Sequence, residues 1–215
     1  MILDRACGIF AEKGYHNASV RDLAAATGTS PAGLYYYFRS KEELLHLILD
    51  SCLSSLLDRV KRAAAGFKDP GKRLKAIVRI HLDHFGQHSE EMQVLVREWK
   101  ALSGPFGEEL RKLMREYTVI VSETFRELHP QRSPEELRAA TFGLFGMLTW
   151  VDQWYRPGRD LPLDLLAEQF SVIFLGGFVP TTPNGSTAAA ANGERTPREW
   201  SLQDSTSSIL SGPGF

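Results

Sequence analysis

Residues 19–44 read SVRDLAAATGTSPAGLYYYFRSKEEL, and this stretch decides the fold. Ser19, with Asp22 three residues later, has the pattern of a helix N-cap and its reciprocal partner. The apolar residues that follow recur at helical spacing. Gly28 then ends the helix, because glycine readily adopts the positive φ that such a stop requires. The stretch therefore opens with a short helix and a tight turn.

The second half of the same stretch predicts two more helix starts. Ser30 followed by Pro31 is a cap with a first-turn proline. Ser40, with Glu43 three residues later, again pairs a cap with an acid. A short helix, a glycine-bearing turn and a second helix form the arrangement that places a recognition helix in the major groove of DNA. We therefore expect double-stranded DNA to be a partner.

The region from Phe10 to Leu44 resembles the DNA-binding domain of the TetR family of bacterial transcriptional regulators. The resemblance covers about a fifth of the chain and includes both caps, two glycines, the aromatic run and a lysine. The matching residues are Phe10, Gly14, Tyr15, Ser19, Val20, Leu23, Ala24, Gly28, Ser30, Leu34, Tyr35, Phe38 and Lys41. The alternative is an unrelated helical protein that contains a short-helix corner.

The resemblance implies how these residues meet DNA. Arg21 is placed to reach a phosphate, and the small residues that begin the second helix can approach thymine methyl groups. Tyr36 is implied to read base edges, whereas Tyr35 and Tyr37 contact phosphates and Tyr35 also helps to close the core. Lys41 adds a cation at a helix N-terminus. The predicted DNA-binding set is Ser19, Arg21, Ser30, Pro31, Ala32, Gly33, Tyr35, Tyr36, Tyr37 and Lys41.

Composition limits the other possibilities. The chain has 215 residues, 43% of them hydrophobic, and a formal net charge of −1. No overall charge attracts nucleic acid, so DNA affinity must come from local charge, helix N-termini and a doubled site. Cys7 and Cys52 suggest neither a disulfide framework nor a metal site. With no signal peptide and no membrane-spanning run, we expect a cytoplasmic protein without a membrane partner.

Helical periodicity continues to about residue 178, and no alternating strand pattern of useful length appears. We predict an all-α protein with a three-helix head and a larger helical body. The predicted domains are a DNA-binding head at 1–45, a ligand-binding and dimerisation body at 46–178 and a disordered tail at 179–215. The long predicted helix, 41–65, would carry changes from body to head. The later predicted helices are 72–87, 89–102, 106–129, 134–155 and 163–178.

A head that reads a palindrome needs two copies, so we expect a homodimer. The resemblance implies that the helices predicted at 134–155 and 163–178 form its interface, although the same residues also suit the core of one subunit. The residues on which this rests are Ala139, Ala140, Gly143, Leu144, Met147, Leu166, Phe170, Ile173, Phe174 and Gly177.

The middle of the chain is rich in aromatic and methionine residues, which in a regulator suggests a cavity for a small hydrophobic effector. Core packing is the alternative for each single residue. The predicted ligand-binding set is Phe85, Trp99, Tyr117, Val121, Phe145, Thr149, Trp150 and Arg156.

A second resemblance concerns the end of the predicted body. The segments Thr149-Trp150-Val151, Trp154-Tyr155-Arg156-Pro157-Gly158 and Phe174-Leu175-Gly176-Gly177 are similar to TetR-type repressors of fatty-acid and steroid catabolism. Those proteins respond to acyl-CoA thioesters. The resemblance implies an acyl-CoA effector, whose phosphates arginines would neutralise. The candidate arginines are Arg97, Arg111, Arg156 and Arg159, and the alternative is that all four are ordinary surface residues.

Other functions remain open at this point. His81, His84 and His88 share one helical face and could hold a metal, but helix solvation or cavity lining explains them better, so we predict no metal. An all-α enzyme could use His81 or His84 as a base, but no nucleophile, paired carboxylates or cofactor loop accompanies them. We therefore predict no enzyme, no catalytic residues and no cofactor. A drug-efflux regulator that senses apolar cations would need a buried acid in its cavity, whereas arginines would favour CoA.

Overall fold

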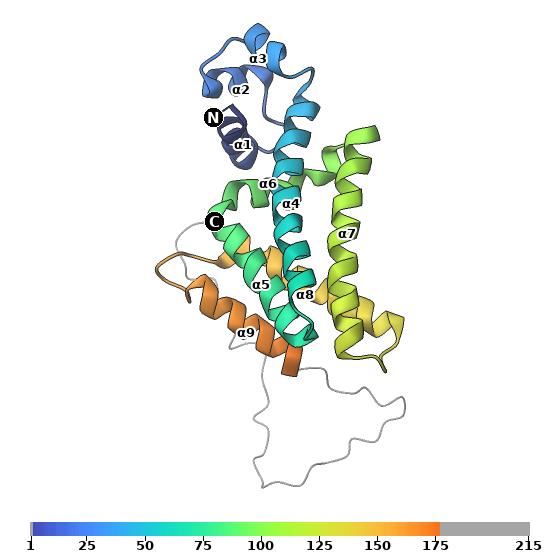
Figure 1. Cartoon of the computed structure of the whole chain (residues 1–215). Helices are drawn as coiled ribbons and strands as arrows, with labels where there is room; N and C mark the ends of the chain where they lie inside the picture. The colour runs from blue at the N-terminus through green and yellow to red at the C-terminus, as the bar shows by residue number, and fades with distance from the viewer. Residues whose placement is uncertain (1, 177–215) are drawn as a thin grey trace, which may run out of the picture. The chain divides into compact units, whose positions relative to one another are not determined.

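The computed structural model describes residues 2–176, and all regular elements in this part of the chain are helices, without a strand (Figure 1). The all-α prediction is confirmed. The elements are α1 (Ile2–Lys13), α2 (Val20–Thr27), α3 (Pro31–Tyr37), α4 (Lys41–Gly66), α5 (Pro70–Gln87), α6 (Ser89–Glu98), the 3-10 turn η1 (Trp99–Ala101), α7 (Gly104–Leu128), α8 (Pro134–Trp154) and α9 (Leu163–Gly176).

Capping contacts fix the beginning and end of α2. The Ser19 hydroxyl accepts the backbone N–H of Asp22 at 3.1 Å, and the Asp22 carboxylate accepts the backbone N–H of Ser19 at 2.9 Å. Lys13 Nζ lies 2.7 Å from Asp22 Oδ1, and this contact holds the pKa of Asp22 below its usual range. Gly28 ends α2 with a φ of 71°.

Helix α4 connects the head, α1–α3, to the body (Figure 1). It packs against α1 near its beginning and against α5 and α7 along the body, while α9 lies along α5. Its buried side chains, from Leu44 to Val60, belong to one hydrophobic core that also includes residues of the head. The predicted domain boundary at residues 45 and 46 therefore falls inside a single continuous helix.

Local sequence explains where the body helices begin. Ser133 Oγ accepts the N–H of Glu136, and the Glu136 carboxylate accepts the N–H of Ser133, so α8 starts with a complete capping box. Asp69 caps α5 through the N–H of Lys72 at 2.7 Å. The predicted helices after residue 40 match the observed ones within a few residues, except that the end of the predicted 89–102 helix is the 3-10 turn η1.

None of the helices between residues 2 and 176 is long and apolar enough to cross a membrane. The predicted disordered tail at 179–215 and Gly177 of the predicted dimer interface lie outside the described residues.

Candidate functional site

The start of α3 is built for a close turn after α2. Ser30 Oγ accepts the N–H of Gly33 at 3.0 Å and caps the helix. A Cβ on Gly33 would lie 2.3 Å from Thr29 Oγ1, so any larger residue would push this side chain away. Leu34 is buried and anchors α3 to the core. Glycine at this position therefore serves the turn itself, besides allowing close approach to a partner.

The outward surface of α3 is formed by the tyrosine triplet. Tyr36 is 85% exposed, and Tyr35 and Tyr37 are also exposed. The Tyr36 and Tyr37 rings meet edge to face, with centroids 5.2 Å apart. The expected part of Tyr35 in closing the core is small, because more than half of its side chain is exposed. All three phenols can therefore reach a partner on this surface.

Lys41 is half-buried, and its side chain makes contacts within the head. Its Nζ donates hydrogen bonds to the carbonyl oxygens of Tyr15 at 2.8 Å and Ala18 at 2.9 Å, and it lies 4.4 Å from the centroid of the Tyr15 ring. These contacts tie the α1–α2 loop to α4 and use two of the three ammonium donors. One N–H donor of the Lys41 ammonium group remains for the predicted phosphate contact. The sequence did not predict that Lys41 also stabilises the head through these hydrogen bonds.

The remaining predicted DNA-contact residues are on the surface of the head. Arg21 is exposed in the first turn of α2, and Pro31 and Ala32 are exposed in the first turn of α3. The Ser19 and Ser30 hydroxyls cap their helices. These residues lie at the N-terminal ends of α2 and α3, where backbone N–H groups favour phosphate, whereas the tyrosines form the last residues of α3.

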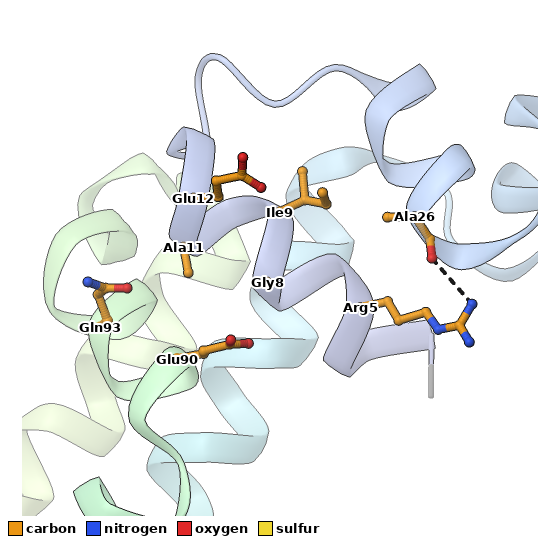
Figure 2. Close-up of a pocket in the computed structure, with 8 residues that line it drawn as sticks. All are labelled: Arg5, Gly8, Ile9, Ala11, Glu12, Ala26, Glu90 and Gln93. Atoms are coloured by element: carbon orange, nitrogen blue, oxygen red, sulfur yellow. Dashed lines mark hydrogen bonds between the residues drawn. The ribbon is translucent and has the colours of Figure 1, made fainter. Parts of the chain in front are cut away.

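The head and body meet where α1 packs against α6 (Figure 2). A shallow groove here is lined by Arg5, Gly8, Ile9, Ala11, Glu12, Ala26, Glu90 and Gln93. Figure 2 shows Glu90 and Gln93 of α6 on the α1 side of their helix, and Arg5 donating to the Ala26 carbonyl at 3.3 Å. The groove thus lies where α6 packs against α1. Arg5 connects α1 to the end of α2 through its hydrogen bond to Ala26.

Two carboxylates link the head directly to the segment around η1. Glu98 Oε1, at the end of α6, accepts the backbone N–H of Tyr15 at 3.1 Å. Glu42 Oε1, at the start of α4, accepts from the backbone N–H of Ser103 at 2.7 Å and from its hydroxyl at 2.8 Å. The first link comes just before η1 and the second just after it, so a displacement of η1 would act on both.

An apolar cavity of about 320 Å³ lies in the body. Five helices and η1 contribute residues to this cavity, and two of the helices, α4 and α6, also contact the head. The lining residues are Leu53, Leu56, His81, Met92, Leu95, Val96, Trp99, Met114, Tyr117, Thr118, Phe142, Phe145 and Thr149. At about 30 Å³ for each water-sized group, there is room for roughly ten non-hydrogen atoms.

Four of the eight predicted ligand-binding residues line this cavity: Trp99, Tyr117, Phe145 and Thr149. The other four lie outside this cavity lining. Val121 is fully buried in the core, Trp150 is 65% exposed on the outer face of α8, and Arg156 is exposed in the loop after α8. Phe85 lines a separate groove of about 460 Å³ beside Tyr155. The sequence predicted the body's aromatic content correctly but not the face on which each residue lies.

The candidate CoA-binding arginines lie outside the cavity lining. Arg97 pairs with Asp152 at 3.4 Å, and Asp152 lines the groove that contains Phe85. Arg159 lies 3.5 Å from Asp160, and the Arg156 guanidinium donates to the carbonyl of Tyr155 at 3.0 Å. The cavity lining itself carries neither an arginine nor an acid.

His81 and His84 lie in α5, and His88 directly follows this helix. His81 Nδ1 lies 3.1 Å from the Tyr117 hydroxyl, whereas His84 Nε2 lies 3.6 Å from Cys52 Sγ. The centroids of the His84 and His88 rings are 4.5 Å apart, and His88 is beside Glu91. Over residues 2–176, no group of three metal-binding side chains could hold an ion. Burial lowers the pKa of His81 to about 3 and that of His84 to about 4.

These lowered values predict acid-sensitive stability. Both histidines stay neutral in the folded state, whereas in the unfolded chain they bind protons below about pH 6.5. The stabilisation is complete above the unfolded pKa and is lost as the pH falls toward the folded values. Between pH 7 and pH 5 we expect the free energy of unfolding to fall by about 2 kcal/mol for each histidine. Urea unfolding at the two pH values measures this change.

Matched variants show which histidines cause this fall in the free energy of unfolding between pH 7 and pH 5. His81→Phe should remove about half of it, whereas replacing the exposed His16 by asparagine should leave it unchanged. Equal unfolding free energies of the wild type at pH 7 and pH 5 would contradict the burial of neutral histidines.

A helix-turn-helix head joined through one long helix to a helical body is the architecture of a DNA-binding transcriptional regulator. Two family models match the chain: "Bacterial regulatory proteins, tetR family" over residues 2–48 and "Tetracyclin repressor-like, C-terminal domain" over residues 68–178. The chain belongs to the TetR family of bacterial transcriptional regulators. This assignment makes it a regulator and not an enzyme.

Individual relatives agree with this assignment. The HTH-type transcriptional repressor KstR2 of Rhodococcus jostii (strain RHA1) is 30% identical over 181 residues, which cover 82% of this chain and 88% of KstR2. A TetR-family regulator from Bordetella parapertussis 12822 superposes with a TM-score of 0.78 at 30% identity, over 82% of this chain and 93% of that one. AibR, solved with isovaleryl coenzyme A and operator DNA, has a TM-score of 0.73 at 24% identity, over 81% and 96%.

Proposed function

We propose that this protein is a homodimeric repressor that binds a palindromic operator and leaves it when a hydrophobic effector enters the body cavity. The observation that carries the proposal is the composition of the cavity wall. Leu53 and Leu56 come from α4, and Trp99 comes from η1. A ligand that displaces these residues acts on the same elements that hold the head.

The outer faces of α8 and α9 support the dimer. On α8, Ala139, Phe142, Gly143, Gly146 and Trp150 are exposed and recur at helical spacing. On α9, exposed apolar residues include Leu165, Val172 and Ile173. Other residues predicted for the interface, such as Phe170 and Leu144, are buried within the subunit. Two adjacent apolar faces of this kind suit a self-complementary interface.

An acyl-CoA is our leading effector. The cavity offers apolar space for an acyl group, and arginines for the CoA phosphates lie outside it, with Arg156 and Arg159 in the loop after α8. AibR, a structural neighbour, was solved with isovaleryl coenzyme A and operator DNA. An apolar cation is less well supported, because no acid lines the cavity to pair with it.

Operator release tests this function. An acyl-CoA series, the matching free acids, CoA alone and a lipophilic cation are titrated into the protein–operator complex. We expect an acyl-CoA to release DNA at the lowest concentration, and Arg156→Glu to weaken release more than it weakens operator binding. Arg62→Glu, an exposed charge reversal on α4, is the control. Release by free acids or cations at lower concentration than by any thioester would overturn the acyl-CoA effector.

Glu98 should contribute to the coupling between effector and operator. Its carboxylate accepts the backbone N–H of Tyr15, and Glu98 directly precedes the cavity residue Trp99 in the sequence. We expect Glu98→Ala to reduce the ratio of operator dissociation constants with and without effector by about tenfold, because coupling energies of this kind are typically 1–3 kcal/mol. Fluorescence anisotropy with labelled operator gives both constants.

The matched control is Glu90→Ala on the same helix. Glu90 faces the head–body groove (Figure 2) without holding a backbone N–H of the α1–α2 loop. It should leave the ratio near that of the wild type. Equal effects of the two substitutions would remove Glu98 from the coupling route.

A further inference from the structure

One polar atom of the cavity wall has no hydrogen-bond partner. His81 is only 3% exposed, and its Nε2 atom is buried without a partner. A buried polar atom left in this state costs free energy, and a ligand that supplies the partner recovers it. The same ring contacts Tyr117 through its other nitrogen, with Nδ1 and the hydroxyl 3.1 Å apart.

The threonine hydroxyls of the wall are already engaged. The Thr118 hydroxyl donates to the carbonyl of Met114 at 2.8 Å, and the Thr149 hydroxyl donates to the carbonyl of Phe145 at 2.8 Å. Both hydroxyl hydrogens are therefore used within their own helices. Besides the indole N–H of the partly buried Trp99, His81 is the polar side chain of this wall that can donate to a ligand.

The Tyr117 contact decides which nitrogen of His81 carries the proton. Burial raises the pKa of Tyr117 above its ordinary value, so the phenol keeps its proton and needs an acceptor. His81 Nδ1 is the acceptor within reach. When the phenol donates to Nδ1, the imidazole proton sits on Nε2. The wall residue His81 then carries a buried N–H donor without a partner.

We propose that the cavity binds a neutral, apolar ligand group whose carbonyl oxygen accepts a hydrogen bond from His81 Nε2. This proposal rests on the proposed function and deepens it, because it names the polar group of the effector that the cavity recognises. The carbonyl belongs either to a ketone or to a thioester, which share this acceptor.

Charge excludes other ligands of the same shape. Burial keeps the pKa of His81 at about 3, so the ring is neutral at physiological pH. No cationic side chain lines the cavity to compensate a carboxylate. A buried charge without a partner is strongly disfavoured. A free acid should therefore bind much more weakly than the ketone of the same shape.

A matched ligand set tests the proposal on the full-length protein without DNA. Acetophenone, isopropylbenzene and benzoate have similar shapes but carry a carbonyl, no polar group and a carboxylate, respectively. Calorimetry should show acetophenone binding about tenfold more tightly than isopropylbenzene, which corresponds to one satisfied donor. Benzoate should bind most weakly. S-methyl thiobenzoate distinguishes the two carbonyl sources, since the better fit of ketone or thioester binds more tightly.

Variants link this preference to the donor. His81→Phe should reduce acetophenone affinity to that of isopropylbenzene, whereas Thr118→Val, which changes a wall residue without a spare donor, should preserve the preference. Circular dichroism checks that both variants fold. An unchanged preference in folded His81→Phe would overturn the proposal. Should that variant not fold, equal binding of acetophenone and isopropylbenzene to the wild type would overturn it instead.

The outcome is separate from that of the proposed repressor function. Carbonyl-selective binding that fails to release operator would uphold the cavity assignment and reject the effector role. Release of operator by a compound that shows no dependence on His81 would uphold the repressor function and reject the assignment.

Discussion

Replacing Trp150 and Ile173 together by glutamate is expected to give a folded monomer that has lost about a hundredfold of its operator affinity, because both half-sites must be held at once. Trp150 on α8 is 65% exposed and Ile173 on α9 is 53% exposed, so neither substitution places a charge inside the subunit. In a dimer both would bury unpaired charge. Analytical ultracentrifugation measures the mass, and gel shifts measure the affinity.

The control for that variant is Val119→Glu on α7. Val119 is also an exposed apolar residue, but it belongs to neither α8 nor α9. It should leave both mass and affinity unchanged. A double variant that remains dimeric, or a stable monomer that binds the full operator as tightly as the wild type, would rule out this interface.

Tyr36→Ala is expected to reduce affinity for the operator by about tenfold or more while leaving binding to unrelated DNA nearly unchanged. Tyr36 is 85% exposed on α3 and makes little contact with the core, so its removal should not disturb the fold. Competition gel shifts with operator and random duplexes give both affinities. Tyr36→Phe separates the hydroxyl from the ring.

Lys41→Met provides the contrast. It removes two hydrogen bonds to the carbonyl oxygens of Tyr15 and Ala18, so it should lower the thermal stability of the head and weaken binding to every DNA sequence alike. If Tyr36→Ala also weakens all sequences equally, the assignment of Tyr36 to base reading is wrong.

Much of the fold was predictable because short-range signals specify helix ends. The Ser19 capping box, the Ser30 and Ser40 caps and the Gly28 stop act over a few residues, and the structure forms each of them. These signals depend on neighbours in sequence, which a single chain reveals.

The cavity depended on contacts between distant residues, and there the prediction was less complete. Helical spacing shows that Val121 and Tyr117 lie near one another on α7, but only the packing of other helices decides that Tyr117 lines the cavity and Val121 fills the core. His81 had a weak signal in its helical spacing, which also suggested a metal ligand or a base. Its pairing with Tyr117 joins residues far apart in sequence.

The proposed repressor requires two copies of the head to bind one palindromic DNA site. Selection from a pool of random duplexes with the purified full-length protein tests this requirement. We predict enrichment of an inverted repeat whose half-sites are contacted by one head each, and loss of that enrichment in the Trp150→Glu, Ile173→Glu variant. Recovery of a single unrepeated motif, or no enrichment above the starting pool, would rule out this mode of DNA binding.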